Sequence, residues 1–309
     1  MGKEFKILYW NINYKEGTAG KNRDNYKLAS KICVDILKKY IDKENISAIV
    51  LTECYPQVNP DMKSYIYDYY RKNGSWKPNY AFEDYKCESD DILKEFEDRY
   101  DVFPYGSIDI GDIKKKGLPF MKMKYLKEGG RKRPRNWSYN PVVIICKKNR
   151  YELVGIKDCP NLLIIKDKAK DFYIAGFRVD NSSGTQKYIE LAKEISKNIK
   201  YLSKSKVVVI GDFNPGNLES FKIEKGINSV IENGLVKDCR DNTTHISKPD
   251  KMLLINCNCE KDDFKVMENV KEYYKKEYPD LLYKGKNNCT IVRAPFPDHN
   301  LLFASIDLG

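Results

Sequence analysis

The sequence has only two histidines among its 309 residues, His245 and His299, and it lacks a long apolar run. A metal site built from three histidines is therefore excluded. No stretch of about 18 apolar residues occurs, which excludes a membrane-spanning helix. The first residues also lack the basic, apolar and small-residue succession of a signal peptide, so we expect a cytoplasmic protein.

A disulfide framework is not indicated either, although the chain contains nine cysteines. Their number is odd and they are widely scattered, which is unfavourable for pairing. Cys257 and Cys259 form a C-x-C pair with no second pair of Cys or His nearby, so a structural zinc site is not expected. Reduced thiols, as in the cytosol, are the simpler interpretation.

Positive charge is present in excess and is unevenly distributed. The chain has 55 Lys and Arg against 44 Asp and Glu, a formal net charge of +11. Residues 57–113 are acidic, with thirteen Asp or Glu and seven Lys or Arg, whereas residues 114–135 are strongly basic. Such a basic stretch suits phosphate backbones. The two blocks could instead pair with each other or be solvated. The candidate substrate contacts are Lys114, Lys115, Lys116, Arg131, Lys132, Arg133 and Arg135.

Apolar periodicity predicts interleaved strands and helices. Strands are predicted at residues 5–13, 46–54, 142–147, 151–156, 162–165, 172–179, 207–210, 252–255 and 301–306. Helices are predicted at residues 22–40, 90–100, 184–202, 218–232 and 266–276. This alternation predicts one α/β domain over residues 1–309, with a large insertion at about 57–140.

Polar residues stand at the ends of several predicted strands. Each one alone could be a loop residue or a helix cap. Together they supply hard oxygen ligands, a candidate base, a cationic clamp and an acid–imidazole pair, which are the parts of metal-assisted phosphate chemistry. These strand-end residues are Asn11, Asn13, Glu53, Arg178, Asp180, Asn181, Asp212, Asn214, Asp250, Asp298 and His299.

Five motifs along the chain resemble the endonuclease/exonuclease/phosphatase superfamily, which has the deoxyribonuclease-I-like fold. They are WNIN at 10–13, LTE at 51–53, GDFN at 211–214, PD before an apolar strand at 249–255, and PDH at 297–299. The resemblance implies a four-layer α/β/β/α sandwich of two packed mixed β-sheets flanked by helices, with the insertion after the second strand. It also implies divalent-metal-dependent cleavage of phosphate esters, with Mg²⁺ as cofactor and Mn²⁺ as a substitute.

The resemblance further implies which residues hold the metal. Glu53 resembles the metal-ligating glutamate of the family, and a hard carboxylate suits Mg²⁺. Asn11 resembles the asparagine that supports the metal or the scissile phosphate, and Asp298 is a further candidate ligand. Asn13 is a candidate substrate contact, although many relatives carry Asp there.

Another group of residues resembles those that act on water and phosphate. Asp212 resembles the carboxylate that orients or deprotonates the attacking water, and Asn214 the amide that holds the phosphate or the nucleophile. His299 resembles the histidine that stabilises charge on the scissile phosphate. Asp250 is expected to orient His299 through its other ring nitrogen.

Arg178 departs from the family pattern, in which His or Tyr is common at this strand end. A guanidinium can grip two phosphate oxygens, but it is a poor general acid because it stays charged. Asn181 matches an asparagine of the abasic-site endonuclease branch. For Arg178 the structural alternative is an ion pair with Asp180 or another carboxylate.

The leading hypothesis for function is a nuclease that hydrolyses DNA or RNA phosphodiester bonds. The net charge and the basic stretch with its aromatic residues suit a nucleic-acid strand. One alternative is a phosphatase or phosphodiesterase acting on small esters, such as inositol phosphates, phospholipid headgroups or nucleotides. A second alternative is a phosphate-binding module on the same fold without turnover. The sequence gives no indication of a protein partner.

Overall fold

The structure is a computed structural model that describes residues 4–12, 23–54, 89–103, 125–128, 131–134, 142–154, 162–179, 184–199, 201–213, 236–240, 250–259, 264–284, 290–292, 296–297 and 299–309. Its helices are α1 (Arg23–Glu44), α3 (Ser89–Glu97), α5 (Gly184–Asn198), α7 (Val270–Glu277) and the short 3₁₀ helix η4 (Pro279–Leu281). In the part of the chain described, no helix combines the length and apolarity that crossing a membrane requires.

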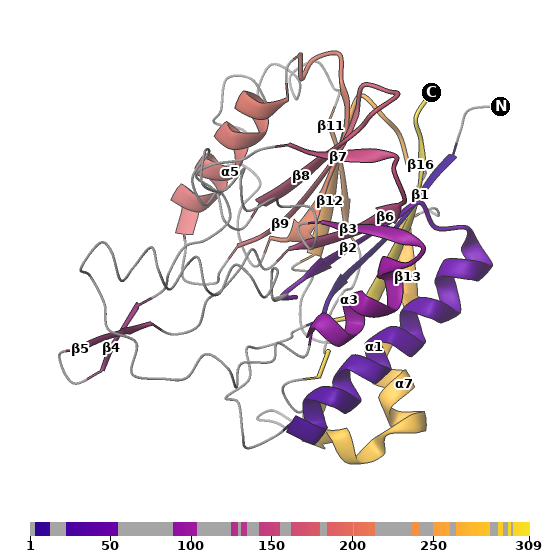
Figure 1. The fold of residues 1–309 in the computed structure, drawn as a ribbon, viewed down its shortest axis with the longest axis vertical. Helices are drawn as coiled ribbons and strands as arrows, with labels where there is room; N and C mark the ends of the chain where they lie inside the picture. Colours follow the sequence, from indigo (N-terminus) through magenta and orange to yellow (C-terminus); the bar gives the residue numbers. More distant parts are fainter. Residues whose placement is uncertain are drawn as a thin grey trace.

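Two six-stranded mixed sheets form the body of the molecule (Figure 1). The first sheet has the order β13 (Phe264–Glu268), β16 (Leu301–Asp307), β1 (Glu4–Asn11), β2 (Ala48–Thr52), β6 (Val143–Lys147) and β3 (Tyr100–Phe103). The second has the order β11 (Val236–Arg240), β12 (Asp250–Ile255), β10 (Lys206–Asp212), β9 (Phe172–Arg178), β8 (Leu162–Asp167) and β7 (Tyr151–Val154). Separate two-stranded pairs are β14 (Leu282–Lys284) with β15 (Thr290–Val292), and β4 (Tyr125–Glu128) with β5 (Arg131–Pro134).

Each six-stranded sheet has a parallel pair at its centre and antiparallel neighbours on both sides. The parallel pairs are β1 with β2 and β9 with β10. The carboxyl ends of two parallel neighbours lie at the same edge of a sheet, so residues that follow them are brought together.

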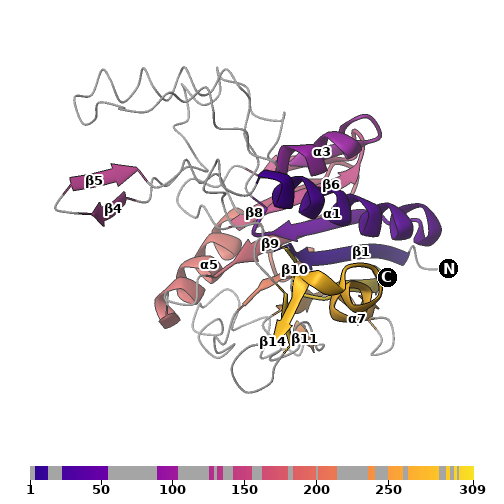
Figure 2. The same ribbon diagram turned by 90° about the horizontal axis from the view of Figure 1, so that it is seen from below.

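Alternation of side chains along the strands creates a four-layer arrangement. On β1, Ile7 and Tyr9 face the second sheet, whereas Leu8 and Trp10 face the helices. The helices α1, α3 and α7 pack on the outer face of the first sheet, and α5 packs on the outer face of the second (Figures 1 and 2). The predicted α/β/β/α sandwich of two mixed sheets is therefore confirmed.

The inter-sheet layer is closely packed around Gly176 on β9. A Cβ atom at this position would lie 2.7 Å from Val142 Cγ1 and 2.8 Å from Val50 Cγ1. Glycine therefore lets the two sheets approach each other two residues before Arg178, at the end of β9.

The predicted helix at 266–276 is partly wrong. Residues Phe264–Glu268 form strand β13, which pairs with β16, and the helix begins only at Val270. The physical reason is the N-cap at Asn269, whose side-chain oxygen accepts a hydrogen bond from the backbone N–H of Glu272 at 3.1 Å. Strand β11 was not predicted either.

The range 57–140 is not separate from the two sheets throughout. Ile92, Leu93 and Phe96 of α3 are buried in the core beneath α1, and β3 pairs with β6 at the edge of the first sheet. The insertion at about 57–140 stays a prediction, because most of this range lies outside the described residues, as does the predicted helix at 218–232.

Candidate active site

The inward-facing positions of the central strands change from apolar to polar at one end of the inter-sheet layer. On β10, Val208 and Ile210 contribute to the inter-sheet core, and Asp212 follows on the same face. Strand register places Asp212 opposite Asp250 of β12 and opposite Arg178 of β9. The same alternation along β1 and β2 places Asn11 and Thr52 on the inward face. We call this region the polar end; it also contains Glu53 and His299.

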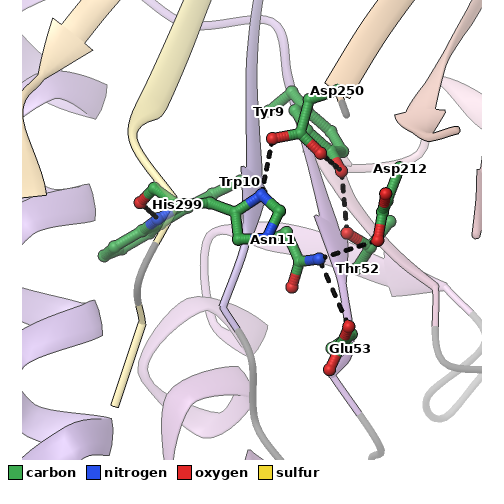
Figure 3. A network of polar contacts seen from close by, with 8 residues as sticks. All are labelled: Tyr9, Trp10, Asn11, Thr52, Glu53, Asp212, Asp250 and His299. Atoms are coloured by element: carbon green, nitrogen blue, oxygen red, sulfur yellow. Dashed lines mark hydrogen bonds and ion pairs between the residues drawn. The ribbon is translucent and has the colours of Figure 1, made fainter. Parts of the chain in front are cut away.

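The amide of Asn11 connects two carboxylates at the polar end. Its Nδ2 lies 3.1 Å from Asp212 Oδ2 and 3.4 Å from Glu53 Oε1 (Figure 3). Asn11 is fully buried, and Asp212 and Glu53 are 2% and 9% exposed. The amide therefore holds two acidic groups from different sheets in one place.

Glu53 combines an unusual backbone conformation with an ion pair. Its φ angle of 52° lies in the left-handed region, which costs a residue with a Cβ about 1–3 kcal/mol. Arg178 Nη2 lies 3.0 Å from Glu53 Oε1, so an ion pair joins the ends of β9 and β2 across the two sheets. The ion pair considered for Arg178 is thus present, and its partner is the predicted metal ligand.

A second chain of hydrogen bonds runs through His299. His299 Nδ1 lies 2.7 Å from Asp250 Oδ2, and the Tyr9 hydroxyl donates to Asp250 Oδ1 at 2.9 Å. The Tyr9 hydroxyl also lies 2.9 Å from Thr52 Oγ1. Figure 3 shows this chain beside the Asn11 contacts. Since Nδ1 of His299 is directed to a carboxylate, Nε2 is the ring nitrogen suited to a substrate.

The backbone of the histidine segment is also held by β1. The indole Nε1 of Trp10 donates to the backbone carbonyl of His299 at 2.8 Å. Trp10 belongs to the core under α1, on the opposite face of β1 from Tyr9. Trp10 therefore contacts His299 directly, whereas Tyr9, on the other face of β1, contacts the carboxylate that binds its ring.

The GDFN motif supports Asp212 by close packing around it. A Cβ at Gly211 would lie 2.0 Å from the carbonyl oxygen of Phe177, so glycine is required where β10 passes β9. The ring of Phe213 packs edge-on against Phe177 with centroids 4.2 Å apart. The buried Lys251 places its Nζ 5.4 Å from the centroid of Phe213, on the outer face of the second sheet.

The donor chemistry of the polar end suits a hard divalent cation. The carboxylates of Glu53, Asp212 and Asp250 are buried at this end, and carboxylate oxygens are ligands that Mg²⁺ prefers. Among the described residues, no group of three or more His, Cys, Asp or Glu side chains could hold a metal by itself. Mg²⁺ commonly binds through one or two carboxylates and keeps water and substrate ligands.

Several predicted site residues cannot be placed relative to this end. Arg131, Lys132 and Arg133 lie on β5, which pairs with β4, and their side chains are not described. The structure brings together Asn11, Glu53, Arg178, Asp212, Asp250 and His299. The residues outside the described part of the chain are Asn13, Lys114, Lys115, Lys116, Arg135, Asn181, Asn214 and Asp298.

Two residues of the polar end, Tyr9 and Thr52, were not predicted from the sequence. Both occupy inward-facing positions of buried strands, where an apolar side chain would be expected. The available signal was a hydroxyl-bearing residue at the last or next-to-last inward position before the strand end. That signal does not identify a partner, because Asp250 is 241 residues away from Tyr9.

The chain was compared with protein families, curated proteins and solved structures, and only solved structures are similar to it. No protein-family model and no curated protein matches the sequence. An endonuclease/exonuclease/phosphatase from Bacteroides vulgatus is similar at 13% identity and a TM-score of 0.48, over 99% of this chain and 100% of that one. TDP2 of D. rerio, complexed with a single-strand DNA product, is similar at 12% identity and 0.41, over 98% of both chains.

A third similar structure is the mannosyl-6-phosphatase of Bacteroides thetaiotaomicron, at 10% identity and a TM-score of 0.44, over 98% of this chain and 99% of that one. At these values the likeness concerns the fold alone. The similar solved structures include endonuclease/exonuclease/phosphatase family proteins.

Proposed function

We propose that this protein is a divalent-metal-dependent phosphodiesterase and that its substrate is DNA or RNA. The observation that carries the proposal is the meeting of both sheets at the polar end, where Asn11, Asp212 and Glu53 lie next to an Asp250–His299 pair. Buried carboxylates, an oriented imidazole and a guanidinium form a set that can activate water and bind phosphate oxygens.

Asp212 is the group that orients and deprotonates the attacking water. It stands at the end of β10, 2% exposed, and the Nδ2 of Asn11 holds its Oδ2 at 3.1 Å. A carboxylate fixed in this way presents its remaining lone pairs in a defined direction, which favours in-line attack. Asn214, two residues further on, is expected to hold the phosphate or the water.

His299 and Arg178 stabilise the negative charge that develops on the phosphate. When His299 is protonated, its Nδ1–H is directed to Asp250 and its Nε2–H can donate to a phosphate oxygen. The guanidinium of Arg178, 16% exposed in its side chain, can bind phosphate oxygens while remaining charged. Because Arg178 cannot serve as an acid, the leaving group takes its proton from water or from Nε2 of protonated His299, which is left neutral with its remaining proton on Nδ1.

Glu53, assisted by Asn11 and Asp298, is proposed to hold the divalent cation. When bound there, such an ion polarises a phosphate oxygen. Asn11 has a second role in this arrangement, because its amide keeps the carboxylates of Glu53 and Asp212 in fixed positions.

Charge supports nucleic acid as the substrate class. The net charge of +11 and the ten Lys or Arg of residues 114–135 favour binding of a phosphate backbone. A small phosphate ester would need only the contacts at the polar end. The two substrate classes therefore make different demands on the basic stretch.

The proposed activity is tested by measuring hydrolysis with Mg²⁺ and with a chelator. Substrates are single- and double-stranded DNA, RNA, and a set of small phosphate esters. We expect Asp212→Asn and His299→Ala each to lower kcat by about 10²–10³-fold without unfolding the protein. Equal turnover in the presence of chelator, or near wild-type turnover by either variant, would refute the proposal. Hydrolysis of small esters without any of nucleic acid would favour the alternative substrate, and binding without hydrolysis would favour a binding module.

Nucleic-acid binding is tested separately by its dependence on salt. Replacing Lys114, Lys115 and Lys116 with Gln should weaken binding and reduce the slope of log affinity against log salt by about 0.9 for each phosphate that the protein no longer neutralises. The matched control replaces three lysines of α7, Lys271, Lys275 and Lys276, and changes the net charge equally. The same slope in both triple variants would remove the basic stretch from the binding surface.

A further inference from the structure

The hydroxyl of Tyr9 lies where three strands of the two sheets meet. It is on β1, it contacts Thr52 of β2 at 2.9 Å, and it donates to Asp250 of β12 at 2.9 Å. The Tyr9 side chain is fully buried in the inter-sheet layer. Buried tyrosines usually engage their hydroxyl, and this one connects the strand that leads to Glu53 with the carboxylate that holds His299.

The direction of the hydrogen bonds in this chain follows from the number of protons. A phenol has a single O–H, and it is directed to the carboxylate of Asp250, so the hydroxyl of Thr52 donates to Tyr9. Burial, and then the nearby charges of Asp250 and Asp212, raise the pKa of Tyr9 well above its usual value. A phenol with its ordinary pKa of about 10 already carries its proton at neutral pH, so Tyr9 is a donor to Asp250.

The Tyr9 hydroxyl contributes to the orientation of Asp250. It is fully buried, and its two oxygens contact different groups, Oδ1 with Tyr9 and Oδ2 with His299. A donor on Oδ1 fixes the rotation of the carboxylate, and this rotation determines where Oδ2 meets the imidazole. The adjacent Trp10 holds the His299 backbone carbonyl at 2.8 Å, so β1 supports both the ring and the main chain of this residue.

We propose that Tyr9 is a positioning residue for His299, acting through Asp250 to hold the imidazole with its proton on Nδ1. The consequence for turnover rests on the proposed catalytic role of His299, whereas the consequence for the tautomer does not. The proposal extends the site to a side chain that would not touch the substrate.

The tautomer can be observed directly by NMR. The chain has two histidines, so ¹⁵N ring shifts of His299 can be assigned with His245→Gln and His299→Gln variants. In the neutral wild-type imidazole we expect the proton on Nδ1. Tyr9→Phe keeps the ring and removes the donor, so we expect a mixture of the two tautomers in that variant.

Kinetics provide the second measurement. Tyr9→Phe should lower kcat by about 10- to 100-fold, the usual range for loss of a supporting hydrogen bond, with little change in KM. Thr52→Val removes the donor to Tyr9 but leaves the Tyr9–Asp250 bond, so we expect a smaller effect in the same direction. This variant also provides the test if Tyr9→Phe does not fold.

Tyr151→Phe is the matched control. Tyr151 is also buried in the inter-sheet core, and its hydroxyl has no hydrogen-bond partner among the described residues. Loss of that hydroxyl should leave the His299 tautomer and kcat unchanged, and the thermal midpoint of each variant shows whether it is folded.

The outcomes separate the inference from the proposed function. An unchanged His299 tautomer in folded Tyr9→Phe, or in Thr52→Val if Tyr9→Phe does not fold, would overturn the inference. If Tyr9→Phe shifts the His299 tautomer but the wild-type protein hydrolyses none of the substrates, the positioning role is supported and the proposed function is refuted. A similar shift in Tyr151→Phe would also overturn the inference, because it would show a general effect of core hydroxyls.

Discussion

The two ends of the second sheet bury carboxylates in different ways. At the end of β8, Asp167 is 1% exposed and accepts hydrogen bonds from Arg150 Nε at 2.8 Å and from the backbone N–H of Ala169 at 2.9 Å. Its partners are close in sequence, because Arg150 precedes β7 and Ala169 follows β8. At the polar end, Asp212 and Asp250 are equally buried, but they contact Asn11 and Tyr9 of the first sheet.

This difference suggests how to distinguish a structural carboxylate from a functional one. Asp167 has one guanidinium for one carboxylate, so its charge is balanced locally. At the polar end the described contacts of the carboxylates come from strands of both sheets: Glu53 pairs with Arg178, Asp212 contacts Asn11, and Asp250 contacts Tyr9. Buried ionisable groups gathered from several strands are typical of functional sites.

The largest expected difference between the two ends comes from neutralising Asp250. Asp250→Asn keeps the size of the side chain but removes the negative charge beside Nδ1 of His299, so the protonated imidazole is no longer stabilised. We expect kcat to fall by roughly 10³-fold or more while the protein stays folded. The measurement is steady-state hydrolysis alongside thermal unfolding, and near wild-type kcat would contradict the role of the pair.

The corresponding substitution at the opposite end of the sheet, Asp167→Asn, should lower stability and leave turnover unchanged. Asp167→Asn leaves Arg150 without its carboxylate and weakens the contact with Ala169, so we expect a loss of about 2 kcal/mol in the free energy of unfolding. Turnover of the folded fraction should be unchanged. Unfolding in denaturant measures the free energy of unfolding, and steady-state kinetics at one temperature measure turnover. A large loss of turnover here would mean that the two ends are not functionally distinct.

Arg178 can be compared with Arg150 in the same way. Arg178→Lys keeps the positive charge but loses the planar pair of donors, so we expect KM to rise roughly tenfold with a smaller change in kcat. Arg150→Lys is the matched control and should leave KM unchanged. Equal kinetics for the two variants would assign Arg178 a structural role like that of Arg150.

An exposed ion pair sets the lower limit of these effects. Lys275 and Glu272 of α7 lie 2.6 Å apart, with side chains 49% and 59% exposed. Glu272→Gln should change the free energy of unfolding by less than about 0.5 kcal/mol. Chemical denaturation measures this change. A larger value would mean that this exposed ion pair contributes more to stability than expected.

The candidate site could be predicted where a polar residue follows a buried apolar run. Glu53 and Asp212 have this signature, Asp250 stands just before such a run, and the expected contact between Asp250 and His299 is present at 2.7 Å. The contact of Arg178 with Glu53 could not be predicted, because it depends on how the two sheets pack against each other. Periodicity describes single strands, whereas these contacts are made between strands distant in sequence.

The sequence predicted single helices and strands, but not every boundary between them. Helix α1 was predicted at 22–40 and extends to Glu44. Residues 264–277 gave a partly wrong prediction because Val266, Val270 and Tyr274 recur every four residues, as on one face of a helix, although the first of them lies on β13. Only the cap at Asn269 separates the two elements, and a single Asn is a weak signal.

The backbone at Glu53 sets folding against function at one residue. Three of the other non-glycine residues with positive φ are asparagines, Asn45, Asn149 and Asn256, and asparagine tolerates this conformation. Glutamate tolerates it poorly, so Glu53→Gly would relieve the backbone but would also remove the carboxylate that pairs with Arg178 and is proposed to hold the cation. One residue thus combines an unfavourable backbone conformation with the charge on which the contacts between the two sheets depend.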